Sequence, residues 1–115
     1  MTTHDDLPYI KHILDNIQRL EESTENKTKQ NLKNDDTLLQ ATIRRIEVIG
    51  EAAKNISAKL KANHPEIEWK KIIGTRDIFI HAYFQIDLGI LWDIVKNDIP
   101  ILKKQIEDIK KDLHT

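Results

Sequence analysis

The sequence predicts an all-α fold, a bundle of about five helices. Apolar residues recur at intervals of three and four through most of the 115 residues, which is the spacing of one face of an α-helix. No stretch alternates apolar and polar residues as a half-exposed strand does, and no internal repeat or low-complexity tract occurs. We expect a single domain over 1–115, because a chain of this length can bury one core but not two.

The composition suits amphipathic helices and excludes several kinds of chemistry. Hydrophobic residues make up 39% and charged residues 32% of the chain. The 18 basic and 19 acidic residues nearly cancel, so any binding of nucleic acid has to come from a local groove rather than from a global field. Cysteine is absent, which excludes disulfides, thiolate nucleophiles and zinc sites with cysteine ligands.

The first residues, "MTTHDDLPYIKHILDNIQRL", contain acids and lack the basic flank and continuous apolar run of a signal peptide. No segment approaches the roughly 20 apolar residues that a membrane-spanning helix needs. We therefore expect a soluble, cytoplasmic protein without membrane contact.

A first helix is predicted by the apolar spacing of Ile10, Ile13, Leu14, Ile17 and Leu20. Its start is indicated by Asp5 or Asp6 as the N-cap and by Pro8 in the first turn. The next segment, "ESTENKTKQNLKNDD", is almost entirely polar and has no periodicity, so it predicts a connection or a frayed helix end.

A long helix is predicted from Thr37 to the proline at position 65, about seven turns. Its apolar stripe consists of Leu38, Leu39, Thr42, Ile43, Ile46, Ile49, Ala53, Ile56 and Leu60. Gly50 lies inside this stripe, where glycine costs about 1 kcal/mol relative to alanine, so we expect another helix to approach closely there.

The rest of the chain predicts three or four shorter helices. "EIEWKKIIGTRDIFIHAYF" indicates one or two, interrupted or bent near Gly74. "DLGILWDIVKND" indicates a helix capped by Asp87, and "DIPILKKQIEDIKKDL" a last helix with Asp98 as its cap and Pro100 in its first turn. We expect one apolar side of the last helix to pack on the bundle, or else to contact a partner protein: Ile101, Leu102, Ile106, Ile109 and Leu113.

Four polar side chains surround an apolar run in "TRDIFIHAYF": Arg76, Asp77, His81 and Tyr83. A histidine can take or give a proton near neutral pH, and an arginine can hold a phosphate and stabilise its added charge. Such a pair can cleave RNA without a metal, because the neighbouring 2′-hydroxyl is a built-in nucleophile. On spacing alone, however, a packing histidine and a structural ion pair are the commoner interpretations.

Arg76 and His81 are five residues apart, which is about 140° around a regular helix, so they do not share a face. Arg76 and Tyr83, seven apart, do. Three explanations are open: the helix is irregular, the long arginine reaches round, or a partner chain supplies a second copy of the segment. A two-fold dimer would bring two such segments together.

The segment and its flanks resemble the HepT-like toxins, a branch of the HEPN (higher eukaryotes and prokaryotes nucleotide-binding) superfamily. The signature of that family is Arg, four residues, His, one residue, Tyr, which is matched by Arg76, His81 and Tyr83. Asp77 fills the position after the arginine, where the superfamily usually has a polar residue. "IGEA", "PEIEW" and "DLGILWDIV" fit as well, so the resemblance runs from about Arg44 to Ile106.

The resemblance implies a HEPN-like bundle that dimerises, and the toxin of a type VII-like toxin–antitoxin system of the HepT/MntA type. It implies a metal-independent endoribonuclease in which the motifs of both chains line one cleft. His81 would be the general acid and base, Arg76 would bind phosphate, and Asp77 would orient one of them. No cofactor and no metal are expected.

The resemblance also implies a cognate nucleotidyltransferase antitoxin that transfers AMP from ATP to Tyr83. The added bulk and negative charge beside Arg76 and His81 would then block the RNA backbone. The expected partners are therefore an RNA substrate, the antitoxin and a second copy of the chain.

Two other functions stay open. One is a non-catalytic HEPN domain that serves as the partner or binding subunit of a minimal nucleotidyltransferase. The intact pair of Arg76 and His81 favours the enzyme, because a binding module does not need it. The other is a plain structural bundle.

Other polar residues have simpler interpretations. Arg44, Arg45 and Lys54 could guide phosphates, but basic residues on a helix of mixed charge are more often solvated or ion-paired. The remaining histidines lack the spacing of metal ligands: His4, His12, His64 and His114.

Two further pairs are expected to serve the fold rather than a site. Glu47 and Glu51 lie four apart on one helix face, and surface placement is the simpler expectation. Trp69 and Trp92 could stack on bases, but we expect them to anchor the core or an interface.

Overall fold

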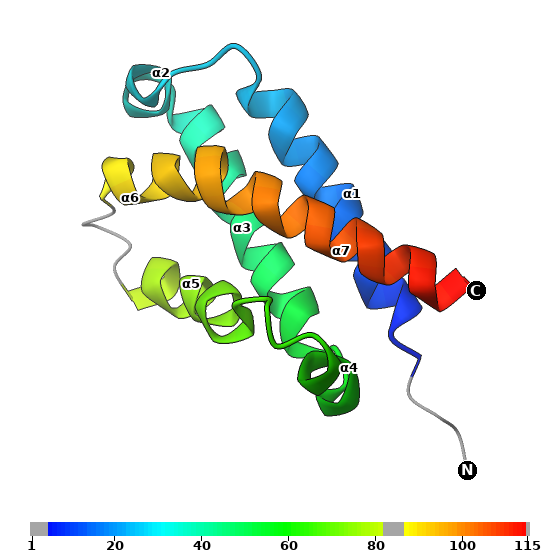
Figure 1. The fold of residues 1–115 in the computed structure, drawn as a ribbon. Coiled ribbons are helices and arrows are strands. Elements are labelled where there is room, and N and C mark those ends of the chain that lie inside the picture. Colours follow the sequence, from blue (N-terminus) through cyan, green and yellow to red (C-terminus); the bar gives the residue numbers. More distant parts are fainter. Residues whose placement is uncertain (1–4, 82–86, 115) are drawn as a thin grey trace.

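The computed structural model describes residues 5–81 and 87–114, without the side chains of 76–81 and 114. Its elements follow one another along the chain as shown in Figure 1: α1 Leu7–Thr24, α2 Lys29–Asn34, α3 Asp36–Lys54, α4 Ala58–Asn63, α5 Trp69–His81, α6 Leu88–Asp93, the π-helical turn η1 Ile94–Asp98, and α7 Ile99–His114. Every regular element in these ranges is a helix, which confirms the all-α fold class.

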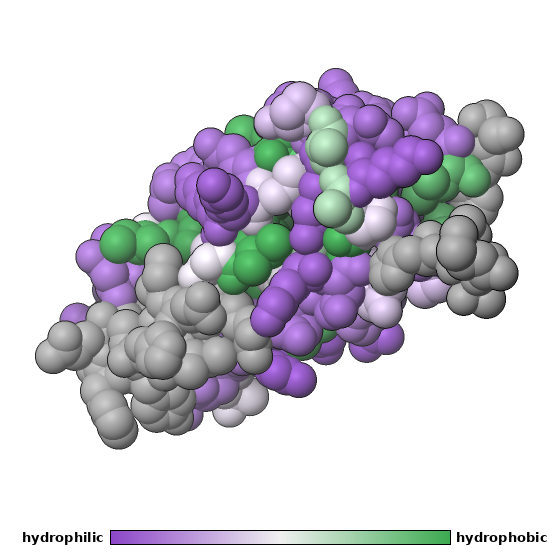
Figure 2. All heavy atoms as spheres, turned by 90° about the horizontal axis from the view of Figure 1, so that it is seen from below, coloured by the Kyte–Doolittle hydropathy of each residue, from purple (hydrophilic) through white to green (hydrophobic). Residues whose placement is uncertain are grey.

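Helix α3 lies in the middle of the molecule. It packs against α1 on one side and α5 on another, while α7 crosses over α1 (Figure 1). The molecule measures 49 × 28 × 22 Å. The face seen in Figure 2 is largely hydrophilic where it is coloured, and apolar side chains interrupt it in a few places. Among the described residues, each helix is too short or too polar to cross a bilayer.

The start of α1 differs from the prediction in one respect. Asp6 occupies the N-cap position and Pro8 lies in the first turn, but the Asp6 side chain makes no capping hydrogen bond to α1. Asp5 accepts a hydrogen bond from the Leu7 N–H at 3.0 Å instead. The Asp6 carboxylate accepts from the backbone N–H of Ser57 at 2.7 Å and from its hydroxyl at 2.6 Å, and so joins α1 to the start of α4.

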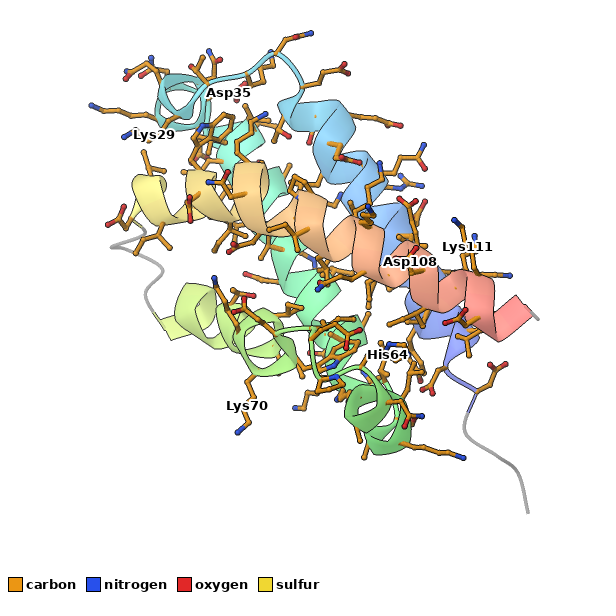
Figure 3. The ribbon with its side chains drawn as sticks, viewed as in Figure 1. Lys29, Asp35, His64, Lys70, Asp108 and Lys111 are labelled. Atoms are coloured by element: carbon orange, nitrogen blue, oxygen red, sulfur yellow. The ribbon has the colours of Figure 1, made fainter. Side chains whose placement is uncertain are left out.

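The segment after α1 is more ordered than predicted. Helix α1 continues to Thr24, and α2 follows, so the expectation of a connection or frayed end was wrong for most of this stretch. Thr28 and Asn31 cap α2 reciprocally: Thr28 Oγ1 accepts from Asn31 N–H at 3.3 Å and Asn31 Oδ1 accepts from Thr28 N–H at 2.8 Å. Asp35, labelled in Figure 3, then caps α3 by accepting from Leu38 N–H at 3.1 Å.

The predicted helix from Thr37 to the proline at position 65 is in fact two helices, and this prediction was wrong. Helix α3 ends at Lys54, and Ser57 caps α4 by accepting from Leu60 N–H at 3.2 Å. The Asp6 carboxylate also accepts a hydrogen bond from the backbone N–H of Ser57. This bond stabilises a non-helical conformation between α3 and α4 over a continuous helix. Gly50 is buried within α3.

The last helix, α7, begins at Ile99 with Pro100 in its first turn, as predicted, but no break in the helical chain precedes it. Asp87 caps α6 as expected, accepting from Gly89 N–H at 2.8 Å and Ile90 N–H at 3.2 Å. From there α6, η1 and α7 follow without a break. The π-helical turn changes the hydrogen-bond register just before Pro100, which lacks the N–H group of a regular helix.

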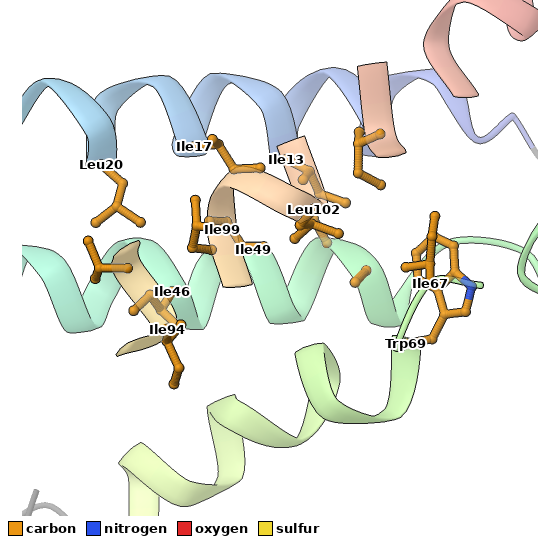
Figure 4. Close-up of a cluster of buried hydrophobic side chains, with 14 of the residues drawn as sticks. Ile13, Ile17, Leu20, Ile46, Ile49, Ile67, Trp69, Ile94, Ile99 and Leu102 are labelled. Carbon is orange, nitrogen blue, oxygen red and sulfur yellow. The ribbon is translucent and has the colours of Figure 1, made fainter. Parts of the chain in front are cut away.

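The core lies where α1, α3 and α7 meet, and Figure 4 shows part of it. Ile13 and Ile17 of α1 face Ile46 and Ile49 of α3 across this layer, and all four are almost fully buried. From α7, the buried side chains are those of Ile99, Leu102, Ile106 and Ile109. Ile101 and Leu113 remain 62% and 40% exposed, so their predicted packing on the bundle was wrong.

Candidate active site

Helix α5 carries three of the four candidate residues. Arg76, Asp77 and His81 lie in its C-terminal half, although their side chains are outside the described part, and Tyr83 lies outside the described residues altogether. The backbone is α-helical from Trp69 to His81, so the predicted interruption near Gly74 is not present. This regularity argues against an irregular helix and leaves the other two explanations for the motif: a reaching arginine or a second chain.

The N-terminal half of α5 is firmly fixed on the bundle. Trp69 is only 8% exposed and its indole Nε1–H donates to the His64 carbonyl at 3.0 Å, which confirms its expected role as a core anchor. Thr75, also buried, donates through its hydroxyl to the Ile72 carbonyl at 2.6 Å. Since α5 also packs along α3, the backbone that carries the motif starts from a rigid base.

On its other side α5 is joined to η1 by an ion pair that the sequence did not predict. Lys71 Nζ lies 3.2 Å from Asp98 Oδ2 and 3.8 Å from Glu68 Oε2. The hydrogen bond that Lys71 donates to Asp98, the charge of Asp98 and that of Glu68 raise the pKa of Lys71. No local signal could have revealed this pair, because α5 and η1 are distant in the sequence.

Two hollows lie between α5 and the rod formed by α6, η1 and α7. They share Lys71, Thr75, Ile94 and Asp98, so they are two parts of one depression, which we call the α5–α7 cleft. The first part encloses about 280 Å³, with Ile46 and Ile49 of α3 among its lining residues. The second part is lined by Gly74 of α5 and by Asp87 and Gly89 at the start of α6.

A second groove lies between α1 and α3, and its two arginines are paired with other side chains of the protein. Arg44 Nη1 lies 3.6 Å from Glu47 Oε2, and Arg45 Nη1 donates to Asn16 Oδ1 at 3.0 Å. Asn16 is 2% exposed and also donates to the His12 carbonyl at 2.9 Å. These contacts confirm the simpler interpretation of Arg44 and Arg45 as paired residues.

The other polar and aromatic residues considered as site candidates lie on helix surfaces or contact other residues of the fold. Glu47 and Glu51 line the groove between α1 and α3 at its surface, and Lys54 lies in the last turn of α3. Trp92 packs against the core, with Lys96 Nζ 4.7 Å from its ring centroid. His64 Nδ1 lies 3.2 Å from Glu66 Oε1. Within the described residues, no three histidine, aspartate or glutamate side chains are grouped so as to hold a metal ion.

Residues 13–109, most of the chain, match the family described as Ribonuclease HepT-like. The chain belongs to the HepT-like ribonuclease family. A protein of Thermococcus cleftensis named "Probable ribonuclease HepT" is 42% identical over 103 residues, which are 90% of this chain and 94% of that protein. A "Putative RNase" of Caldanaerobacter subterraneus subsp. tengcongensis is 36% identical over 102 residues, 89% of this chain and 91% of that one.

A longer relative is found in Methanocaldococcus jannaschii. It is named "Gamma-glutamylcyclotransferase and putative RNase" and is 44% identical over 105 residues, 91% of this chain. The chain spans only 47% of that relative, so it corresponds to one portion of the longer protein. No solved structure is significantly similar to this one.

Proposed function

We propose that this HepT-like protein is a metal-independent endoribonuclease and the toxin of a type VII-like toxin–antitoxin system. The observation that carries the proposal is the sequence motif of Arg76, His81 and Tyr83, whose first two residues lie in α5, in a chain whose family and relatives are named as ribonucleases. Arginine and histidine are the groups that RNA cleavage through the 2′-hydroxyl requires.

The proposed reaction is a transesterification within RNA. His81 takes the proton of the 2′-hydroxyl, whose oxygen attacks the adjacent phosphorus, and the bond to the 5′-oxygen breaks as that oxygen gains a proton. Arg76 binds the phosphate and stabilises the charge of the transition state. Asp77 orients one of these two side chains, Arg76 or His81. The products are a 2′,3′-cyclic phosphate and a 5′-hydroxyl.

We infer that the working site belongs to a homodimer. On the regular helix α5 the two catalytic positions are about 140° apart, which does not favour joint action of Arg76 and His81 within one chain. A two-fold axis beside α5 would set the arginine of one chain against the histidine of the other.

Control by a nucleotidyltransferase antitoxin completes the proposal. Transfer of AMP to the Tyr83 hydroxyl, with release of pyrophosphate from ATP, would place a phosphodiester next to the phosphate-binding arginine. Its negative charge and its bulk would exclude the RNA backbone from that position. We place toxin and antitoxin in the cytoplasm, where RNA and ATP are present.

The test compares RNA cleavage by the parent protein, His81→Ala and His12→Ala, in excess chelator, after intact mass has shown that no AMP is attached. His12 is an exposed residue of α1 whose backbone carbonyl would still accept from Asn16 after the change, so it is a matched control. We expect cyclic-phosphate ends from the parent and from His12→Ala, and a rate lower by at least about 100-fold in His81→Ala.

Equal cleavage by His81→Ala would contradict the assignment of the general acid and base. No cleavage of several RNA classes by the unmodified parent would favour the alternative function, a binding subunit of a nucleotidyltransferase.

A further inference from the structure

The α5–α7 cleft exposes apolar surface that the fold itself does not cover. Three large hydrophobic side chains are exposed among the described residues, and two of them, Ile90 and Ile101, line this cleft. They are 56% and 62% exposed. Ile46 and Ile49, which belong to the core, line the bottom of the same depression. Exposed apolar surface that is continuous with the core is typical of a surface that binds a partner.

The cleft is also strongly acidic. Among the described side chains, its lining contains one ammonium group, that of Lys71, and five carboxylates: Glu66, Glu68, Asp87, Asp93 and Asp98. Lys71 is itself held between Glu68 and Asp98, so its charge is already compensated. Glu66, Glu68 and Asp87 are exposed to solvent. The negative potential of this surface is therefore available to a partner.

Charge decides between the possible occupants of the cleft. RNA is a polyanion, and an acidic lining would repel it. A second copy of the chain, related by a two-fold axis, would bring the same carboxylates against each other. A basic partner gains from the excess of carboxylates in this lining, and its apolar side chains can cover Ile90 and Ile101.

We propose that the α5–α7 cleft binds a basic amphipathic helix of a partner protein. The apolar side chains of that helix, at positions i, i+3 or i+4 and i+7, lie between α5 and α7 on Ile90 and Ile101. Its lysines and arginines lie along the carboxylates of the rim. This binding does not depend on RNA cleavage.

The probe is a designed helical peptide of leucine and lysine, with leucines on one face, and its counterpart has glutamate in place of every lysine. Each is titrated into the full-length protein, with binding followed by calorimetry and by amide chemical shifts. We expect the lysine peptide to bind and to shift residues of α5, α6 and α7 that line the cleft. Added salt should weaken this binding, and the glutamate peptide should not bind.

Two variants of the cleft and two matched controls test where the peptide binds. Ile101→Ser removes an exposed apolar contact and Glu68→Lys reverses an exposed charge, and each should weaken binding about tenfold. Leu113→Ser and Asp108→Lys make the same kinds of change outside the cleft, on α7 (Asp108 is labelled in Figure 3). The controls should bind like the parent.

Several results would overturn the proposal. These are equal binding of the glutamate peptide, equal weakening by the control variants, and chemical shifts confined to the groove between α1 and α3. Concentration-dependent shifts of the cleft residues without peptide would identify a second copy as the occupant. Shifts of the same residues with single-stranded RNA would identify nucleic acid. Cleavage assays are independent of all these measurements, so a failure of peptide binding leaves the proposed ribonuclease function untouched.

Discussion

Asp6 joins two helices that are distant in the sequence. Its carboxylate accepts two hydrogen bonds from Ser57, whereas Asp5 accepts one exposed hydrogen bond from the next turn. We predict that Asp6→Ala lowers the free energy of unfolding by about 1–3 kcal/mol, because two donors at the start of α4 lose a charged acceptor. Asp5→Ala should cost well under half of that. Urea unfolding of both variants measures the difference, and equal losses would contradict it.

Asn16 is a buried residue whose side chain bonds to groups inside the protein. It donates to the His12 carbonyl and accepts from Arg45, across the contact between α1 and α3. We predict that Asn16→Leu lowers stability by about 1–3 kcal/mol, because the guanidinium of Arg45 loses its acceptor in a partly buried place. Arg45→Met should cost less, since Asn16 keeps its bond to His12. Thermal unfolding followed by circular dichroism compares the two, and the reverse order would count against this explanation.

At the scale of elements, the short helix α2 depends on its cap. Thr28 and Asn31 satisfy each other's backbone N–H groups, and Leu32 is the only fully buried side chain of this helix. We predict that Thr28→Ala raises the hydrogen-exchange rates of the α2 amides, by a factor that corresponds to about 1 kcal/mol. Thr28→Ser keeps the hydroxyl and should exchange like the parent. Unchanged exchange in Thr28→Ala would show that packing of Leu32 alone holds α2.

The ion pair between Lys71 of α5 and Asp98 of η1 contributes to stability in a way that depends on pH, and the sign of this dependence follows from the pKa of Lys71. Asp98, and then Glu68, raise the pKa of Lys71 above its ordinary value of 10.5. The pair therefore contributes its full stability below the ordinary lysine pKa and loses it as the pH rises through the higher pKa of the folded state.

We predict that Asp98→Asn lowers the pKa of Lys71 toward its ordinary value, because the first cause of the shift is removed. The measurement is an alkaline titration of the Lys71 side-chain carbon shifts. Lys103, whose pKa is raised by Glu21, is the internal control and should titrate as in the parent. A Lys71 titration that is identical in Asp98→Asn would refute Asp98 as the cause of the raised pKa.

The elements also show which features a sequence can predict. Helix α1 and the Asp87 cap follow from local patterns, and both were predicted. The break between α3 and α4 depends on Asp6, which is 51 residues from Ser57, so no window of sequence contains its cause. The α2 cap was local but was missed, because asparagine takes the place of the usual glutamate or glutamine. Pro100 correctly indicated the start of α7, but no local pattern indicated the π-helical turn η1 that joins it to α6 without a break.

At the scale of the whole molecule, the motif residues could be identified from the sequence but their surroundings could not. Arg76, Asp77, His81 and Tyr83 were recognised from spacing and resemblance. The α5–α7 cleft forms only in the folded protein, where residues of α5 and α7 line it together with Ile46 and Ile49 of α3. Its apolar and acidic lining comes from several separate stretches of the chain, none of which is unusual by itself.

The composite site gives a prediction for the assembled molecule. If Arg76 of one chain works with His81 of the other, a heterodimer of Arg76→Ala and His81→Ala chains contains one intact site and one site without either group. Random mixing makes half of the dimers heterodimers, so the mixture should regain about one quarter of the parent RNA cleavage, although each variant alone is inactive. The measurement unfolds the two purified variants together, refolds them and follows cleavage against the mixing ratio. Recovery should peak at equal amounts of the two chains. A mixture as inactive as its components, with heterodimers verified by mass, would place both groups of each site within one chain and require Arg76 to reach round α5.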